Sequence, residues 1–431
     1  MHKMKKSGIR YVVVLLLIST AVATVVRAQT AIRVTIIGDS TVCNYAASKY
    51  PMTGWGQVLQ LFFVSGSVTV NNRAIGGRST RSFYQEGRWA EIVPTLRKGE
   101  YVFIQFGHND RDYTKAERYT DTTDFKEYLR KYVNESRAKD AIPVLISPMN
   151  MNAWNGTTLR EVFCEGANNY RGAMLNVAKE LSVPFIDLEK KSVALQKRMG
   201  QTYSAKFIHL GLDPGEYPGY PDGISDGTHF QEMGANFMAA FVCEGIRELA
   251  DDTDMSSLAE QLKPLFKMGV SANKPGIGLI TENGNSFPEG VSITVKVKPN
   301  STEKFIGWFD ASGTKNTAAQ RYTFPMPEQD VACAARFEGG TVKLSAGNET
   351  NVPNRICATL TRGTVRFDNV DVPFSIDFFS VDGRKLASGT VVPVKGVALF
   401  PLSLAGMKQG TFLLRTTVRE KETVSGFAFI K

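Results

Sequence analysis

Residues 31–250 alternate short apolar segments with amphipathic ones, and this alternation restricts the possible folds more than any other feature of the chain. Between the apolar segments lie stretches with helical periodicity, such as 54–64, 124–138 and 170–181. Strands that are apolar throughout and separated by helices form a parallel sheet covered on both faces. The alternation therefore predicts an α/β domain with strands at 32–38, 67–75, 101–107, 142–148 and 183–188.

The chain changes character beyond about residue 250. Helical periodicity fades after the segment 256–267, and alternating apolar and polar residues follow, interrupted by turn-forming glycines. This pattern is typical of β-strands. It predicts a linker at 251–273 and then two small all-β modules, with strands at 291–299, 304–310, 321–327, 341–347, 358–368, 374–383 and 411–420.

The first 28 residues have the order of a secretory signal peptide. Four basic residues lie within 1–10, an uncharged apolar run covers 11–26, and Val26 and Ala28 are small residues at the positions that a signal peptidase prefers. The pattern predicts cleavage after Ala28 and a mature protein that is secreted, periplasmic or on the cell surface, with no membrane insertion. A retained membrane anchor is the alternative.

Charge and cysteine usage exclude some functions. Removal of residues 1–28 takes away five basic residues and no acidic ones, so the formal net charge falls from +9 to +4. Without a cluster of lysine and arginine, a nucleic-acid partner is not predicted. The five cysteines are widely spaced and lack metal-ligand spacing, so no metal is predicted. An exported protein could form one or two disulfides, or keep buried free thiols.

Small polar residues follow three of the predicted strands. The turns are Gly-Asp-Ser-Thr at 38–41, Gly-Gly-Arg-Ser at 76–79 and Gly-His-Asn-Asp at 107–110. Open parallel sheets bind ligands at the carboxyl ends of their strands, where these turns would meet. Ser40, Gly77 and Asn109 are the candidates, since glycine allows backbone N–H groups close to a ligand.

A serine hydroxyl needs an adjacent base to act as a nucleophile, and the chain has four histidines. His2 lies in the signal peptide, His108 lies within the third turn, and His209 stands alone. His229 follows Asp226 by three residues, at the predicted start of the last helix, so the carboxylate could hold one ring nitrogen and leave the other for Ser40.

Each of these residues also has a purely structural interpretation. Ser40 could lie in a turn or cap a helix, Gly77 could serve a turn, Asn109 could form an Asx turn, and Asp226 could cap the helix that begins at His229. Their occurrence together, each after a predicted strand or at a helix entrance, favours a catalytic set. In that set the N–H groups of Ser40 and Gly77 and the Asn109 amide would stabilise an oxyanion.

The motifs "GDST", "NRAIGGRSTRSF", "GHND" and "DGTHFQEMGA" resemble the four blocks of the SGNH (GDSL-type) hydrolase superfamily, its rhamnogalacturonan acetylesterase branch in particular. The resemblance covers about residues 31–250. It implies a three-layer, flavodoxin-like α/β/α domain at 29–250 and ester hydrolysis without metal or cofactor. Ser40 would be the nucleophile and Asp226 and His229 its triad partners, with Ser40, Gly77 and Asn109 forming the oxyanion hole.

The chain departs from this branch after its fourth predicted strand. A pair of arginines that many members carry there is absent, and Asn150 and Asn152 occupy the position. Candidate contacts to substrate are Arg78, Asn152, Tyr217 and Tyr220, with surface or packing roles as the alternatives.

The two β modules carry resemblances of their own. Residues 290–337 resemble an internalin B-type repeat, which gives a module at 274–340. Residues 374–431 are similar to C-terminal sorting domains of type IX-secreted proteins, which gives a module at 341–431. An accessory module that binds carbohydrate is the alternative, and neither segment contains a catalytic set.

These observations predict a secreted, monomeric serine esterase that removes acetyl groups from a plant cell-wall polysaccharide, with rhamnogalacturonan or related pectin as the expected substrate. A xylan or other carbohydrate acetylesterase is one alternative. A lipase or thioesterase is another, although no extended apolar loop surrounds the motifs. The non-enzymatic alternative is a surface protein that binds carbohydrate and has an inactive hydrolase fold.

Overall fold

The structure is a computed structural model of the 431-residue chain. It describes residues 31–251, 254–272, 285–299 and 304–338, together with the strands at 342–343, 357–361, 364–368, 374–380, 385–391, 397–401, 410–418 and 421–429. The predicted signal peptide lies outside the described residues. Within the described part of the chain, no helix is both long enough and apolar enough to span a bilayer.

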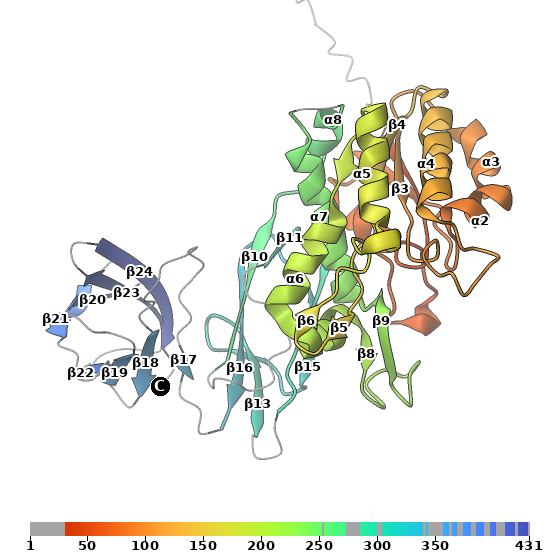
Figure 1. The fold of residues 1–431 in the computed structure, drawn as a ribbon. Helices are drawn as coiled ribbons and strands as arrows, with labels where there is room; N and C mark the ends of the chain where they lie inside the picture. Colours follow the sequence, from red (N-terminus) through yellow and green to blue (C-terminus); the bar gives the residue numbers. More distant parts are fainter. Residues whose placement is uncertain are drawn as a thin grey trace, which may run out of the picture. The chain divides into compact units, whose positions relative to one another are not determined.

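A five-stranded parallel sheet forms the centre of the first domain (Figure 1). Its spatial order is β2-β1-β3-β4-β7, the flavodoxin-like order that was expected from the resemblance. The strands are β1 (Ile32–Gly38), β2 (Val68–Asn72), β3 (Tyr101–Gln105), β4 (Ile142–Ile146) and β7 (Phe185–Ile186). All five predicted strands exist; β1 has the predicted bounds, and the other four are shorter than predicted.

Helices cover both faces of this sheet, and its strands β1, β3 and β4 are buried on both faces. Ile36 of β1 packs into the core on the side of α7, and the next residue, Ile37, packs into the core on the side of α4 and α5. Helices α4 and α5 lie side by side on that second face (Figure 1). The three-layer α/β/α architecture is therefore confirmed.

The helices of this domain differ in length. They are α1 (Trp55–Val58), α2 (Thr80–Gln85), α3 (Arg88–Ile92), α4 (Thr122–Arg137), α5 (Tyr170–Leu181), α6 (Leu188–Tyr203), α7 (Glu232–Glu248) and α8 (Ser256–Ala259). The helix predicted at 54–64 is only one turn of α-helix followed by a 3-10 turn. Short hairpins complete the domain: β5 (Trp154–Asn155) with β6 (Thr158–Leu159), and β8 (His209–Leu212) with β9 (Ile224–Phe230).

The next part of the chain is all-β. A five-stranded sheet has the order β11-β10-β16-β13-β14, and β12 pairs with β15. The strands are β10 (Phe266–Ala272), β11 (Asn285–Phe287), β12 (Ser292–Lys296), β13 (Phe305–Phe309), β14 (Lys315–Thr317), β15 (Arg321–Pro325) and β16 (Val331–Phe337). The end of the predicted linker is therefore a strand, because β10 pairs along its length with β16.

This β module packs directly against α7. The rings of Phe237 and Phe287 lie 5.3 Å apart, and the Asn236 side chain donates a hydrogen bond of 2.7 Å to the Ser292 carbonyl. Residues of β12 belong to the same buried core as those of α7. Continuous burial of this kind couples the two parts more firmly than a flexible tether would.

The last described strands form two four-stranded antiparallel sheets, β17-β18-β19-β22 and β21-β20-β23-β24. Their bounds are β17 (Val342–Lys343), β18 (Cys357–Thr361), β19 (Thr364–Asp368), β20 (Phe374–Ser380), β21 (Lys385–Val391), β22 (Val397–Pro401), β23 (Gly410–Val418) and β24 (Lys421–Phe429). The expectation of all-β C-terminal modules is confirmed. Cys43, Cys164, Cys243 and Cys333 are free thiols, so none of these four forms a disulfide.

Candidate active site

Ser40 lies in the turn that follows β1. Gly38 ends the strand where a side chain would collide with the backbone, because a Cβ there would lie 2.6 Å from the Gln105 carbonyl oxygen. Asp39 is buried, and its Oδ1 accepts hydrogen bonds from the Thr41 N–H at 2.9 Å and the Thr41 hydroxyl at 2.7 Å. This turn presents Ser40, half-buried, at the carboxyl edge of the sheet. No described helix begins at Ser40, so the helix-cap alternative is wrong.

The second glycine-bearing loop lies directly against Ser40. The Ile75 N–H donates to the Gly38 carbonyl at 3.0 Å, which holds the loop beside the end of β1. A Cβ built on Gly76 would lie 3.5 Å from the Ser40 Cβ. Gly77 has φ of +81°, a backbone conformation that favours glycine. The predicted pair Ser40 and Gly77 is thus brought to one place.

The third loop is fixed to the second by two polar side chains. Asn109 donates through Nδ2 to the Arg78 carbonyl at 3.0 Å. The buried Asp110 accepts from the Thr80 N–H at 2.9 Å and from the Gly107 N–H at 3.1 Å. Burial raises the pKa of Asp110 to about 7. Sequence reasoning missed this role of Asp110, although the residue ends the "GHND" turn.

Asp226 and His229 are in direct contact. His229 Nδ1 lies 2.6 Å from Asp226 Oδ2, and Asp226 Oδ1 accepts from the N–H groups of Thr228 and His229 at 2.7 and 3.0 Å. Burial raises the pKa of Asp226, but these bonds and the His229 charge outweigh it and hold the pKa at about 2. Burial lowers the pKa of His229, but the bond to Asp226 and the charges of Asp226 and Asp39 raise it above its ordinary value.

The structural setting of His229 differs from the expectation. His229 lies on strand β9 (Ile224–Phe230), and helix α7 begins only at Glu232, so Asp226 does not cap that helix. The Thr53 N–H donates to the Phe230 carbonyl at 3.1 Å, which ties the end of β9 to the segment that follows Ser40. Within β9, the N–H groups of Thr228 and His229 hold the Asp226 carboxylate in place beside the His229 ring.

The other two described histidines are less suited to act as a base. His209 is fully buried beside Gln196, whose Nε2 lies 2.8 Å from its Nε2, and burial lowers the pKa of His209 to about 3. His108 is buried, with its Nδ1 3.3 Å from Asp39 Oδ2. His229 is the most accessible of the three, with 27% of its side chain exposed.

Ser40 and His229 are not hydrogen-bonded to each other among the residues that the structure describes. In the absence of substrate, catalytic hydrogen bonds are often long and shorten only in the complex. Ser40 follows the carboxyl end of β1, and the charge of the neighbouring Asp39 raises the pKa of His229.

Two of the predicted substrate contacts, Arg78 and Asn152, make hydrogen bonds within the protein. Arg78 donates through Nε to the Glu86 carboxylate at 3.1 Å and through Nη1 to the Gly76 carbonyl at 2.8 Å. Part of its hydrogen-bonding capacity is therefore already used within the protein. Asn152 is half-buried, and its N–H donates to the Gly227 carbonyl at 2.8 Å, beside Asp226. The Asn152 backbone therefore contacts the turn between Asp226 and His229, and the role of its side chain in substrate binding stays a prediction.

The two predicted tyrosines differ from each other. Tyr217 is 4% exposed, the Arg321 guanidinium lies 4.1 Å from its ring centroid, and the Tyr50 ring packs against it at 5.6 Å. The Tyr217 ring is thus not available to stack on a sugar, which corrects that expectation. Tyr220 is half-buried and donates to the Lys49 carbonyl at 3.1 Å, so its role stays a prediction.

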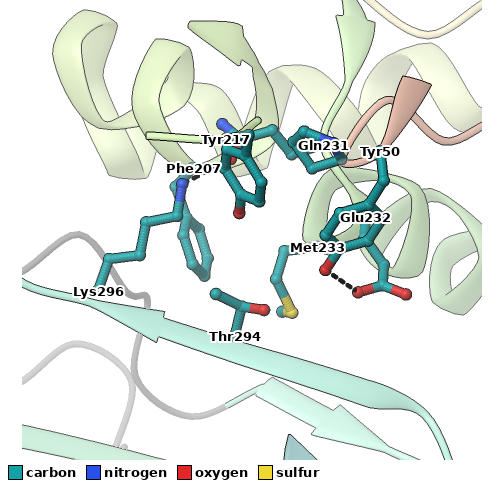
Figure 2. A pocket seen from close by; sticks show the side chains of 9 residues that line it. Tyr50, Phe207, Tyr217, Gln231, Glu232, Met233, Thr294 and Lys296 are labelled. Carbon is teal, nitrogen blue, oxygen red and sulfur yellow. Dashed lines mark hydrogen bonds between the residues drawn. The ribbon is translucent and has the colours of Figure 1, made fainter. Parts of the chain in front are cut away.

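A pocket between β12 and the start of α7 does not belong to this site. Figure 2 shows Tyr217, Gln231 and Lys296 around it, with Thr294 on the strand below and a hydrogen bond of 3.0 Å from the Tyr50 hydroxyl to Glu232. Neither Ser40 nor His229 lines it. The pocket marks the junction between the α/β domain and the β module.

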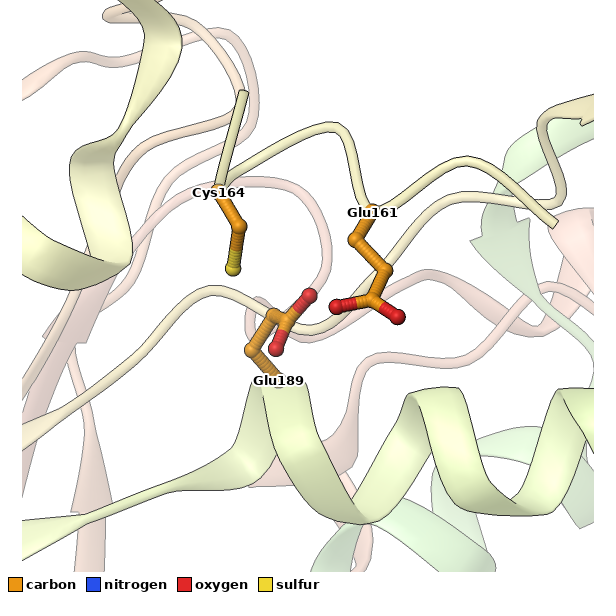
Figure 3. A group of neighbouring side chains, drawn as sticks. All are labelled: Glu161, Cys164 and Glu189. Atoms are coloured by element: carbon orange, nitrogen blue, oxygen red, sulfur yellow. The ribbon is translucent and has the colours of Figure 1, made fainter. Parts of the chain in front are cut away.

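Figure 3 shows Glu161, Cys164 and Glu189, whose potential ligand atoms lie within 4.8 Å of one another. The sequence spacing gave no sign of this cluster. Lys197 lies 2.7 Å from Glu161, and Arg171 lies 3.8 Å from Glu189, so both carboxylates already have cationic partners. Burial raises the pKa of the Cys164 thiol to about 12, which disfavours the thiolate that a metal needs.

The chain matches two family models. Residues 36–234 match the GDSL-like Lipase/Acylhydrolase family. This segment contains every proposed catalytic residue. Residues 268–341 match the Divergent InlB B-repeat domain, which agrees with the resemblance of the first β module.

Curated relatives match the α/β domain. The chain is 40% identical to rhamnogalacturonan acetylesterase RhgT of Bacillus subtilis over 218 residues, 51% of this chain and 90% of the relative. It is 38% identical to the probable rhamnogalacturonan acetylesterase YesY of the same organism, over 50% of this chain and 92% of the relative. The solved structure of YxiM from Bacillus subtilis is 25% identical with a TM-score of 0.43, covering 52% of this chain and 58% of that one.

Proposed function

The chain belongs to the GDSL-like lipase/acylhydrolase family, and from this premise we propose that it removes acetyl groups from rhamnogalacturonan or a related pectic polysaccharide. It is a serine-dependent carboxylic ester hydrolase. The observation that carries the proposal is the direct contact of His229 with Asp226 on a strand whose backbone is bonded to Thr53, in the segment that follows Ser40. The similarity to relatives named rhamnogalacturonan acetylesterases supports the choice of substrate.

The proposed mechanism uses the side chains of Ser40, His229 and Asp226. Asp226 accepts the hydrogen bond of His229 Nδ1–H, which leaves Nε2 free as a base. Nε2 takes the Ser40 proton while Oγ attacks the acetyl carbonyl, and an acetyl-enzyme forms as the sugar hydroxyl leaves with that proton. A water molecule, deprotonated by His229, then attacks the acetyl-enzyme and releases acetate.

The tetrahedral oxyanion would be stabilised by donors from the three loops. The N–H groups of Ser40 and Gly77 supply two of them. The Asn109 amide has two N–H bonds, and one of them already donates to the Arg78 carbonyl, so the other is available for the oxyanion. That existing bond orients the amide before substrate arrives, which reduces the reorganisation needed during reaction.

The proposed location of the reaction is outside the cytoplasm. The signal-peptide pattern of residues 1–28 supports export, and a polysaccharide is too large to enter a cell intact. The similarity of residues 374–431 to sorting domains supports attachment to, or passage through, the cell envelope. Detection of the mature N-terminus at Gln29 in the exported protein would test this part of the proposal.

The decisive experiment measures acetate release from acetylated rhamnogalacturonan, homogalacturonan, xylan and mannan. We expect the pectic substrates to react fastest and Ser40→Ala to abolish release. Ser65→Ala, which changes an exposed serine outside the site, is the matched control and should keep full activity. Activity that persists in Ser40→Ala would contradict the nucleophile assignment.

Ester chain length separates deacetylation from lipid hydrolysis. With p-nitrophenyl esters, we expect acetate to be cleaved faster than octanoate. A preference for the longer chain would favour a lipase or thioesterase and contradict the proposed function.

A further inference from the structure

Arg111 carries a positive charge that no carboxylate neutralises within the described part of the chain. Its Nη1 donates to the Met151 sulfur at 3.5 Å, and its guanidinium lies 5.7 Å from the centroid of the Phe163 ring. Its Nε is buried without any hydrogen-bond partner. A thioether is a weak acceptor, so most of the hydrogen-bonding capacity of this guanidinium is unused.

The position of Arg111 relates it to the proposed active site. Arg111 follows Asn109, a proposed oxyanion donor, by two residues. Its contact Met151 precedes Asn152, whose N–H donates to the Gly227 carbonyl next to Asp226. The guanidinium therefore packs against the segment that follows β4, and the same segment contacts the turn between Asp226 and His229 through the Asn152 backbone.

A second arginine of the same loop lies over the oxyanion glycine. A Cβ built on Gly77 would lie 3.7 Å from Arg118 Nη1. Arg118 Nη2 is paired with Asp112 at 2.8 Å, and its Nε is buried without a partner. Arg118 is thus partly neutralised, whereas Arg111 is not, so Arg111 is the stronger candidate for binding an external anion.

We infer that Arg111, assisted by Arg118, binds a carboxylate of the sugar chain beside the acetyl ester and selects uronate-containing substrates in their free-acid form. This inference rests on the proposed acetylesterase function. A guanidinium binds a carboxylate through two parallel N–H···O hydrogen bonds, whereas a neutral sugar or a methyl ester has no negative charge to pair with it.

The test compares three substrates that differ in charge. They are an acetylated oligogalacturonate, its methyl ester, and an acetylated xylo-oligosaccharide. We expect wild-type kcat/KM to favour the free acid over its methyl ester, and Arg111→Met to reduce that ratio by about tenfold to a hundredfold. Arg111→Lys should keep part of the preference, because lysine retains the charge but not the two-pronged geometry.

The control is Arg130→Met on α4, which removes an arginine paired with Glu127 and Glu180 and should leave the ratio unchanged. Equal losses on all three substrates in Arg111→Met would indicate a purely structural role and overturn the inference. A wild-type enzyme without preference for the free acid would overturn it as well.

Binding of unacetylated oligogalacturonate, measured by calorimetry, separates this inference from the proposed function. Weaker binding by Arg111→Met than by wild type supports the inference even without turnover, and equal or undetectable binding by both proteins overturns it. Absence of acetate release from every carbohydrate would instead contradict the proposed function.

Discussion

Lys296 Nζ lies 2.6 Å from Oε1 of Gln231, so a side chain of the β module reaches the residue two positions after the proposed catalytic base. The lysine also pairs with Glu216 at 2.7 Å, and only 8% of its side chain is exposed. Gln231 in turn donates to the His209 carbonyl at 2.7 Å. The β module thus helps to hold the strand that carries Asp226 and His229.

Lys296→Met should therefore destabilise the protein. The substitution keeps an apolar stem but leaves Gln231 and Glu216 without their buried partner, a change that costs about 1–3 kcal/mol. The free energy of unfolding from urea denaturation measures the effect. Lys298→Met, which removes an exposed lysine paired with Asp213, is the control and should change stability by less than about 0.5 kcal/mol. Equal effects of both substitutions would contradict the coupling.

Asp226→Asn should reduce kcat by about a thousandfold to ten-thousandfold while the protein stays folded. The amide is isosteric but does not stabilise the imidazolium, and it can favour the wrong His229 tautomer. Asp222→Asn, which changes an exposed residue four positions earlier, should keep wild-type activity. Acetate release by purified variants with matching circular dichroism spectra provides the comparison. A loss below tenfold would remove Asp226 from the proposed triad.

The pH profile should have an acidic limb above the ordinary histidine pKa of about 6.5. Asp226 and Asp39 raise the pKa of His229, and only the neutral ring can accept the Ser40 proton, so kcat/KM should rise as pH increases through that raised pKa. In Asp226→Asn the principal raising influence is lost, and the limb should move to lower pH. If the acidic limb stays at the same pH in this variant, the limb reports the titration of a group other than His229.

The main elements of the fold could be predicted because their signals are local. Strands β1, β3 and β4 are apolar throughout, and burial on both faces of a parallel sheet requires such runs. The strand β9 could not be predicted, because "ISDGTHF" lacks apolar alternation and is set by its pairing with β8 and by bonds to the Asp226 carboxylate. Tertiary contacts there outweigh local propensity.

The candidate site was predictable in its chemistry but not in its surroundings. Ser40 and Asn109 could be chosen as candidates because they belong to short motifs after predicted strands, and His229 because Asp226 precedes it by three residues. The burial of Tyr217 under Arg321 depends on a residue more than a hundred positions away, in another module, and no local pattern records it. The unpaired state of Arg111 likewise depends on which carboxylates the fold brings near it.

Asn109→Ala should lower kcat by about a hundredfold to a thousandfold with little change in KM for small esters. The amide is proposed to bind the oxyanion more strongly than the ground-state carbonyl, so its loss raises the barrier rather than weakening substrate binding. Asn134→Ala on the exposed face of α4 is the matched control and should leave both constants unchanged. Steady-state kinetics with p-nitrophenyl acetate measure kcat and KM separately. An increase in KM at constant kcat would place Asn109 in ground-state binding instead, and then Ser40 and Gly77 alone would carry the oxyanion.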